Sequence, residues 1–330
     1  MKQYKYFFGV DISKQTVDIT LINDQQAIHR KFSNDATGMD DLLAWLNSSS
    51  LDLSRALFCM EATGLYCFCL TEFLPAHCID IWIEHTARIK NATALDRGKT
   101  DKIDSKRIAL YATKNLERLM LWKPSDATVQ KIRHLSALRE RLVETKKRLI
   151  TPIKECEEVG NHSMATLLNK AIKSSLTAID KDLKNVESNI MGVINEDEHL
   201  KQLYKLITSV VGIGFVTAVN LIVYPNGFTL LKETRKLACY CGVAPFPYSS
   251  GSSIGGKTRV HYMANKKLKC NLHMASLSAV KLDGDLKAYY KRKVGEGKNK
   301  MSVLNAVKNK LLARVVAVVN KQQCYVKKIA

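Results

Sequence analysis

The stretch Tyr6-Phe-Phe-Gly-Val-Asp11-Ile-Ser places one carboxylate inside an apolar run. A short run rich in aromatic and β-branched residues predicts a buried β-strand. A second run, Ala56-Leu-Phe-Cys-Met-Glu61, ends on another acid. A buried carboxylate costs folding free energy unless it is paired or bound to a metal ion. The two runs therefore predict strands that carry an acidic site.

The rest of the N-terminal part alternates between strand and helix patterns. Strands alternating with helices are typical of an α/β sheet. Helical spacing follows the apolar residues of two segments, 38–47 and 64–74. The segments with strand patterns are 6–13, 16–23, 56–61 and 79–84.

A third acidic element follows the strands. Asp101 and Asp104 lie three residues apart in a segment, 101–118, that reads as a helix, so they would share one helix face. Hard cations such as Mg²⁺ take oxygen ligands from a few carboxylates and leave room for substrate phosphates. Acids at strand ends together with an acidic pair on a helix therefore predict a two-metal phosphodiester site.

Two long helices are expected over residues 126–192, with a break near Gly160. This region has almost no Pro or Gly, and its apolar residues recur at helical intervals, which is typical of a helical hairpin or coiled coil. A compact helical subdomain and a dimerising coil are both compatible with the pattern.

A glycine pair, Gly212 and Gly214, separates two apolar helical segments within 198–225. This arrangement suggests a helix-hairpin-helix, in which glycines allow backbone N–H groups to approach a phosphate. An ordinary turn has the same pattern. Further helices are expected at 230–241, 266–282 and 301–320.

The net charge of +20 is concentrated at one end of the 330-residue chain. Residues 1–118 carry 15 Lys and Arg against 15 Asp and Glu, residues 119–200 carry 13 against 12, and residues 201–330 carry 23 against 4. Such an excess predicts that a polyanion binds mainly to the C-terminal part.

Nine scattered cysteines without a CxxC pair disfavour a disulfide framework or a zinc site. With no signal-peptide pattern and no apolar stretch long enough to span a membrane, the expected location is a reducing cytoplasm.

Serine, glycine and cationic residues cluster in Tyr248-Ser-Ser250-Gly251-Ser-Ser-Ile-Gly-Gly-Lys257-Thr-Arg259. A flexible loop that presents hydroxyls beside Lys257 and Arg259 could hold a nucleophile next to a phosphate. Loops of this composition are also common without any catalytic role. Lys291, Arg292 and Lys293 predict a patch that contacts a nucleic-acid backbone without reading its sequence.

Five motifs in order resemble the DEDD transposases related to the Piv invertase, a group that includes bridge-RNA-guided recombinases of insertion sequences. The resemblance covers essentially the whole chain. The motifs are Gly9-Val-Asp11-Ile-Ser, Cys59-Met-Glu61-Ala-Thr-Gly64-Leu-Tyr66, Lys99-Thr-Asp101-Lys-Ile-Asp104, Val211-Gly-Ile-Gly214 and Tyr248-Ser-Ser250-Gly251-Ser-Ser-Ile-Gly.

The resemblance implies three parts. A RuvC-like domain with an RNase H fold would occupy residues 1–120, a helical coiled-coil segment 121–197, and a basic helical transposase domain 198–330. The family's catalytic serine falls on Ser250.

The four metal-site positions of the family fall on Asp11, Glu61, Asp101 and Asp104. Mg²⁺ is the expected ion, with Mn²⁺ as an alternative.

The resemblance implies a bacterial protein associated with the nucleoid. The expected partners are donor and target DNA, a non-coding guide RNA, and further copies of the chain in a dimer or tetramer. The sequence departs from the family pattern after the serine motif. Tyr262 stands where the family often has lysine, and Ala264 where it often has glycine.

The resulting hypothesis is a recombinase in which Ser250 forms a covalent link to DNA beside a Mg²⁺-binding acidic cluster. Ser249 is the nearest competing nucleophile. Two rival functions remain open, namely a junction-resolving nuclease that uses water and a DNA invertase that needs no guide RNA.

Overall fold

The computed structural model describes residues 2–23, 26–62, 64–92, 100–124, 126–228, 233–250 and 254–326. Within these ranges, the side chains of residues 247–250, 254, 255 and 257 lie outside the description. The chain divides into two compact units, Met1–Pro124 and Ser125–Ala330, and each is described by itself. The three-part division expected from the resemblance stays a prediction.

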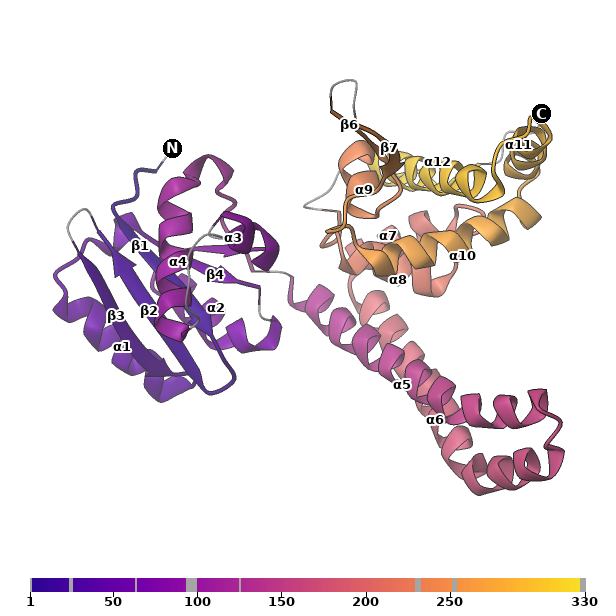
Figure 1. Ribbon diagram of the computed structural model, residues 1–330, viewed down its shortest axis with the longest axis horizontal. Helices are drawn as coiled ribbons and strands as arrows, with labels where there is room; N and C mark the ends of the chain where they lie inside the picture. The colour runs from indigo at the N-terminus through magenta and orange to yellow at the C-terminus, as the bar shows by residue number, and fades with distance from the viewer. Residues whose placement is uncertain are drawn as a thin grey trace. The chain divides into compact units, whose positions relative to one another are not determined.

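A mixed five-stranded sheet forms the centre of the first unit (Figure 1). The strand order is β3-β2-β1-β4-β5. β1 pairs antiparallel with β2, and β2 with β3, whereas β4 lies parallel to both β1 and β5. This confirms the expected mixed α/β architecture. The strands are β1 (Tyr6–Ile12), β2 (Thr16–Ile22), β3 (Ala27–Ser33), β4 (Ala56–Glu61) and β5 (Asp80–Glu84).

Helices cover both faces of the sheet. The face of Phe8 and Val10 packs against α1 (Ala36–Ser48) and α2 (Phe68–Ala76). The opposite face carries Cys59 and Trp82 and packs against Ile89 of α3 and Ile108 of α4. The bounds are Thr86–Ala92 for α3 and Asp101–Lys114 for α4, and short 3₁₀ helices lie at Leu53–Arg55, Gly64–Cys67 and Leu116–Arg118.

Gly9 allows α4 to lie directly on β1. A Cβ atom at this position would stand 2.1 Å from both the Ser105 carbonyl oxygen and the Ala109 nitrogen. Beside this contact, the hydroxyls of Thr20 and Ser105 are hydrogen-bonded at 2.8 Å in a buried position. The contact fixes where the first turn of α4 sits over the strands.

An antiparallel helical hairpin opens the second unit (Figure 1). It consists of α5 (Ala127–Glu158) and α6 (His162–Glu196). Ion pairs join Arg139 to Glu187 at 2.7 Å and Lys146 to Asp180 at 2.5 Å, as antiparallel pairing requires. The break expected near Gly160 is present, with that residue at φ +78°.

The remainder of the second unit is mostly helical, as expected. Its core includes Leu203, Leu221, Leu272 and Leu311 from four different helices. None of the helices in the described ranges has both the length and the apolarity needed to cross a bilayer. The helices are α7 (Glu198–Thr208), α8 (Phe215–Val223), α9 (Thr234–Tyr240), α10 (Lys266–Leu282), α11 (Gly284–Gly295) and α12 (Lys300–Lys321).

The serine segment corrects one expectation. A flexible loop was expected, but its flanks form an antiparallel hairpin of β6 (Phe246–Ser250) and β7 (Ile254–Arg259). Backbone pairing brings Ser249 opposite Gly255 and Ser250 opposite Ile254. Serine and glycine are uncommon in the interior of strands, which is why the composition of this segment resembled a loop.

Candidate active site

Strand register brings two of the predicted acids to one edge of the sheet. Asp11 lies next to the last residue of β1, and Glu61 is the last residue of β4. Parallel strands end at the same edge, and the pairing of Val10 with Met60 places the two acids at neighbouring positions. Because side chains alternate along a strand, Asp11 faces the same side as Gly9, which is the side that α4 covers.

The other two acids lie in the first turn of α4. Thr100 caps this helix, since its hydroxyl accepts a hydrogen bond from the Ile103 backbone nitrogen at 3.3 Å. Asp101 and Asp104 follow in the first turn. The packing of α4 on Gly9, one turn further along, brings this turn towards the carboxyl end of β1.

Electrostatics connects all four acids. The pKa of Asp11 is raised from 3.8 to about 6, first by burial and then by the charges of Asp104, Asp101 and Glu61. A raised pKa shows that a second negative charge is unfavourable here. The other three acids named from the sequence therefore lie close enough to Asp11 for their charges to raise its pKa.

Two of these carboxylates have partners and two have none. Arg107 donates to Asp104 at 2.9 Å, and the Lys31 ammonium lies 3.6 Å from Asp101. Across the residues the structure describes, no hydrogen bond or ion pair reaches the carboxylates of Asp11 and Glu61.

The donor set fits a hard divalent cation, which would relieve the repulsion of unpaired oxygen ligands. As the described side chains stand, however, no three His, Cys, Asp or Glu residues are close enough to enclose an ion. The metal-site assignment therefore remains a prediction.

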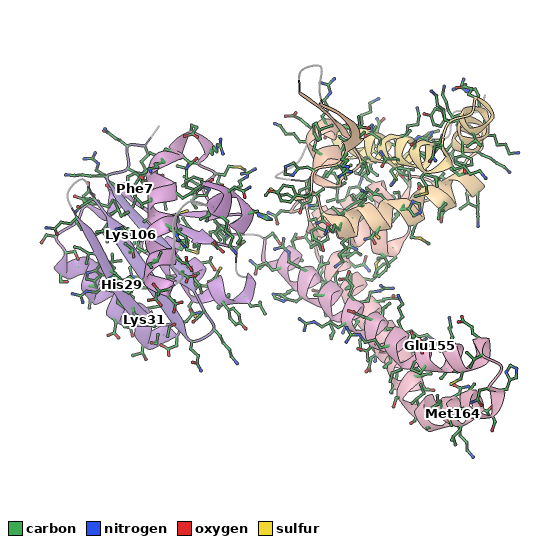
Figure 2. The ribbon with its side chains drawn as sticks, viewed as in Figure 1. Phe7, His29, Lys31, Lys106, Glu155 and Met164 are labelled. Atoms are coloured by element: carbon green, nitrogen blue, oxygen red, sulfur yellow. The ribbon has the colours of Figure 1, made fainter. Side chains whose placement is uncertain are left out.

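Sequence reasoning missed a buried acid beside this cluster. Asp18 lies opposite Asp11 on β2 and is 4 % exposed. Its carboxylate lies 2.9 Å from His29 Nε2 and 3.2 Å from Lys31 Nζ, both on β3 (Figure 2). An acid inside the apolar run of β2 is the same signal that singled out Asp11, so the sequence could have identified it.

Glu84 was missed in the same way. It ends β5, is 5 % exposed and lies opposite Glu61. The Tyr111 hydroxyl donates to it at 3.1 Å, and Arg88 lies 3.3 Å away. These partners satisfy Glu84, which favours a structural role.

The glycine pair has a packing role in the second unit. Gly212 has φ +94°, and a Cβ there would lie 2.7 Å from the Ala279 side chain on α10. Gly214 is the N-cap of α8 and has open space around it. Close packing thus explains Gly212, while Gly214 leaves the first turn of α8 accessible.

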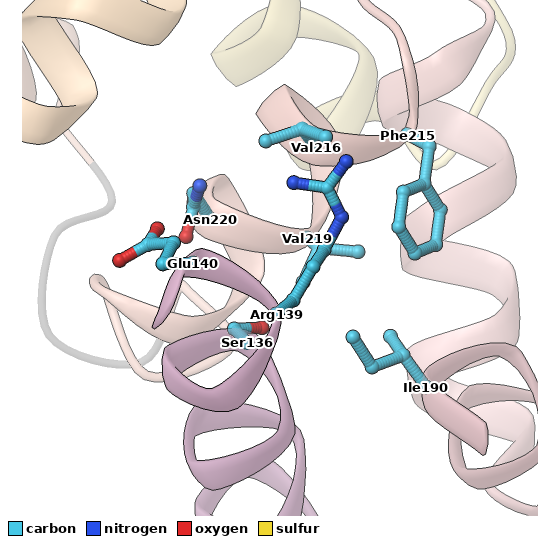
Figure 3. A pocket seen from close by; sticks show the side chains of 8 residues that line it. All are labelled: Ser136, Arg139, Glu140, Ile190, Phe215, Val216, Val219 and Asn220. Carbon is cyan, nitrogen blue, oxygen red and sulfur yellow. The ribbon is translucent and has the colours of Figure 1, made fainter. Parts of the chain in front are cut away.

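A narrow cavity lies between α5, α6 and α8 (Figure 3). Its two charged lining residues are already paired, Arg139 with Glu187 and Glu140 with Lys267. The cavity therefore offers no unpaired charge to a phosphate. It is lined by Ser136, Arg139, Glu140, Ile190, Phe215, Val216, Val219 and Asn220.

The predicted cations differ in how free they are. Lys293 is paired with Glu296 at 2.6 Å, and Arg292 lies over the ring of Tyr289. Lys291 and Arg259 are exposed. The side chains of Ser250 and Lys257 lie outside the described part, so only their backbone positions in the hairpin are known.

Comparison with known proteins identifies two transposase segments. Residues 8–156 match the IS110-type DEDD transposases, described as "Transposase". Residues 204–291 match the "Transposase IS116/IS110/IS902 family".

Relatives extend the similarity over the chain. The "Pilin gene-inverting protein" of Moraxella lacunata is 26% identical over 330 residues, covering 98% of this chain and 99% of the relative, and the protein of the same name from Moraxella bovis matches equally. An "Insertion element IS110 uncharacterized 43.6 kDa protein" of Streptomyces coelicolor is 29% identical over 134 residues, covering 41% of this chain and 32% of that protein. The chain therefore belongs to the IS110/IS116/IS902 family of transposases.

Proposed function

We propose that this chain is a site-specific DNA recombinase that cuts and rejoins strands through a metal-binding acidic cluster and the hydroxyl of Ser250. The observation that carries the proposal is the half-buried, unpaired carboxylate of Asp11, whose pKa is raised to about 6 by burial and by the charges of four other acids, three of which are Asp104, Asp101 and Glu61. A fold keeps such a repulsive group when function needs it. Membership in a transposase family supplies DNA as the substrate class.

The fold assignment that goes with this proposal is an RNase H-like, RuvC-related first unit. Three antiparallel strands followed by two parallel ones, in the order β3-β2-β1-β4-β5, support it. In the second unit, α7, the Gly212–Gly214 turn and α8 are proposed as a helix-hairpin-helix that approaches a DNA phosphate through the start of α8.

Asp11, Glu61, Asp101 and Asp104 would hold Mg²⁺, or Mn²⁺ in its place. When bound, the ion supplies charge neutralisation at the scissile phosphate and at the leaving oxygen. Gly9 and Ser105 position the acids on α4 relative to those on the strands.

Serine chemistry accounts for rejoining. The Ser250 oxygen attacks the phosphorus, a seryl–phosphate bond forms, and the bond from phosphorus to the leaving sugar oxygen breaks. The serine proton passes to a neighbouring carboxylate and then to that sugar oxygen. Attack by a sugar hydroxyl of the recipient strand reverses these steps, so no ATP is consumed. Serine is a weak nucleophile near neutral pH, so a neighbouring acid must activate it.

Alanine substitutions test the proposed nucleophile. Ser250→Ala should abolish both recombinant product and the covalent protein–DNA adduct that survives denaturation. Ser249→Ala is the matched control on the adjacent residue and should retain both. Asp11→Ala should abolish both while DNA binding persists.

Strand exchange by purified Ser250→Ala would contradict the covalent scheme. Cleavage without rejoining in that variant would favour a RuvC-like nuclease that uses water.

The matched pilin gene-inverting proteins favour DNA inversion without a guide RNA as a second candidate function. The family resemblance instead favours a bridge RNA that pairs with donor and target DNA. Sequencing of RNA that copurifies with the chain, expressed together with its flanking DNA, separates the two. If an active preparation contains no specific bound RNA, the result favours a DNA invertase that needs no guide RNA.

Assembly into a dimer or tetramer completes the proposal. Apolar side chains are exposed on the α5–α6 hairpin, namely Leu138, Val143, Met164 and Leu167, with exposed fractions of 42% to 60%. Exposed apolar groups on long helices offer surface for a contact between copies.

A further inference from the structure

Lys308 is a buried cation without a counter-ion. It lies on α12, and only 5 % of its surface is exposed. A buried ammonium costs free energy unless an anion accompanies it. Yet no carboxylate lies within ion-pairing distance of Lys308 in the described ranges, and the charged group that acts on it most strongly is a second lysine, Lys269 of α10.

The acids of the C-terminal part, which carries Lys308, are paired with other cations. Residues 201–330 contain only four acidic side chains. Glu233 pairs with Lys236, Asp283 and Asp285 with Arg314, and Glu296 with Lys293. The undescribed residues of this unit, 125, 229–232, 251–253 and 327–330, include no Asp or Glu.

Lys269 and the helix that carries Lys308 both contact the chain that enters the serine hairpin. The side chain of Lys269 lies over Gly242, where an added Cβ would stand 3.4 Å from its Cδ atom. One turn before Lys308 on the same helix, the Asn305 amide donates to the Val243 carbonyl at 2.8 Å. β6 begins three residues later, at Phe246.

We propose that Lys269 and Lys308 form an anion site that holds a phosphodiester of the DNA strand at the base of the β6–β7 hairpin. A phosphate supplies the negative charge that no carboxylate of the described residues provides, and two ammonium groups can share its oxygens. Burial, together with the charge of Lys269, lowers the pKa of Lys308, and a bound phosphate would oppose that shift. The site shares with the proposed function only its DNA substrate and needs neither Ser250 nor the acids.

Binding of duplex DNA to the full chain, measured with EDTA present so that cleavage does not contribute, tests the site. Lys308→Met should weaken binding and reduce the slope of log K against log salt by about 0.9 for the lost phosphate contact. Its melting temperature without DNA should stay equal or rise, because the variant no longer buries an unpaired charge. A lysine with a purely structural role would show the opposite, a lower melting temperature with an unchanged slope.

Lys269→Gln should reduce the slope in the same way, and it keeps the test valid if Lys308→Met fails to fold. Lys281→Gln removes an exposed cation from the same helix and serves as the matched control for general charge. If Lys269→Gln and Lys281→Gln give the same slope, the site is wrong. If only binding to a single-stranded RNA of equal length weakens, the assignment to DNA is overturned. Recombination assays of Ser250→Ala report on the proposed function separately.

Discussion

Asp11 shows how one partly buried carboxylate can oppose folding. Its pKa is raised from 3.8 to about 6 by burial and neighbouring acids, so the folded chain binds the Asp11 proton more tightly than the unfolded chain does. Because of this tighter proton binding, the contribution of Asp11 to the free energy of unfolding is fully present below about pH 4 and is lost as the pH rises towards 6. At neutral pH the charged carboxylate therefore destabilises the first unit.

Asp11→Asn should raise the free energy of unfolding at pH 7 by up to roughly 3 kcal/mol without divalent ions, and the gain should vanish near pH 4. Denaturant unfolding at both pH values measures it. Mg²⁺ should stabilise the parent chain and leave the variant unchanged. Asp41→Asn, at an exposed acid on α1, is the control and should show neither effect. The account is refuted if the difference in unfolding free energy between Asp11→Asn and the parent is no larger at pH 7 than at pH 4.

The acids could be predicted as candidates from the sequence, but their convergence could not. An acid in an apolar run is visible by inspection, which is how Asp11 and Glu61 were identified. The register that sets Asp11 beside Glu61 depends on strand pairing between segments 50 residues apart in the sequence. Asp18 was overlooked although it carries the same signal, and its burial appears only once β3 covers one side of β2.

At the level of elements, α4 is the part that completes the acidic cluster. Gly9→Ala would force a methyl group into the helix backbone, 2.1 Å from its nearest atoms. The helix must then shift, and we expect a loss of about 2 kcal/mol or more in unfolding free energy, with reduced recombination.

Gly192→Ala is the matched control, because this helical glycine has nothing within 4 Å of the added Cβ. That change should stabilise the chain by up to about 1 kcal/mol. Thermal unfolding of both variants gives the comparison. Equal stability of Gly9→Ala and the parent would show that α4 does not depend on this contact.

Elements with strong apolar periodicity were predicted well. β1, β2, β4 and the long helices follow directly from their patterns. β3 was missed because its residues His29, Arg30 and Lys31 are polar and largely exposed at the sheet edge. α11 was missed because it begins and ends in glycine and is dense in charge. Both elements pack against the elements next to them in the chain, β3 against β2 and α11 against α10 and α12, so their absence from the prediction reflects weak apolar patterns and not long-range contacts.

The whole molecule separates charge by unit. The acidic cluster lies in a first unit whose residues 1–118 carry no net charge, while residues 201–330 carry 23 cations against 4 acids. Each unit has its own hydrophobic core, so each is expected to fold alone.

A fragment of residues 126–330 should therefore bind duplex DNA with a steep salt dependence, and a fragment of residues 1–124 should bind far more weakly. Titrations at about 50 and 200 mM salt measure this dependence. Between these two salt concentrations, the affinity of the 126–330 fragment should fall about a thousandfold if it makes six or more phosphate contacts. Circular dichroism of both fragments confirms folding. Comparable affinity of the two fragments would show that the charge excess is not the DNA-binding determinant.

The alternation of side chains along β1 also determines where the protein tolerates an inserted or deleted residue. Inserting a single residue between Gly9 and Asp11 would rotate the carboxylate into the apolar layer formed by α1 and α2. The same insertion at the Gly160 turn merely enlarges the connection between α5 and α6. Insertions and deletions are thus expected to be tolerated at the Gly160 turn but not in β1. The spacing of two residues between Gly9 and Asp11 must be kept for both to face α4.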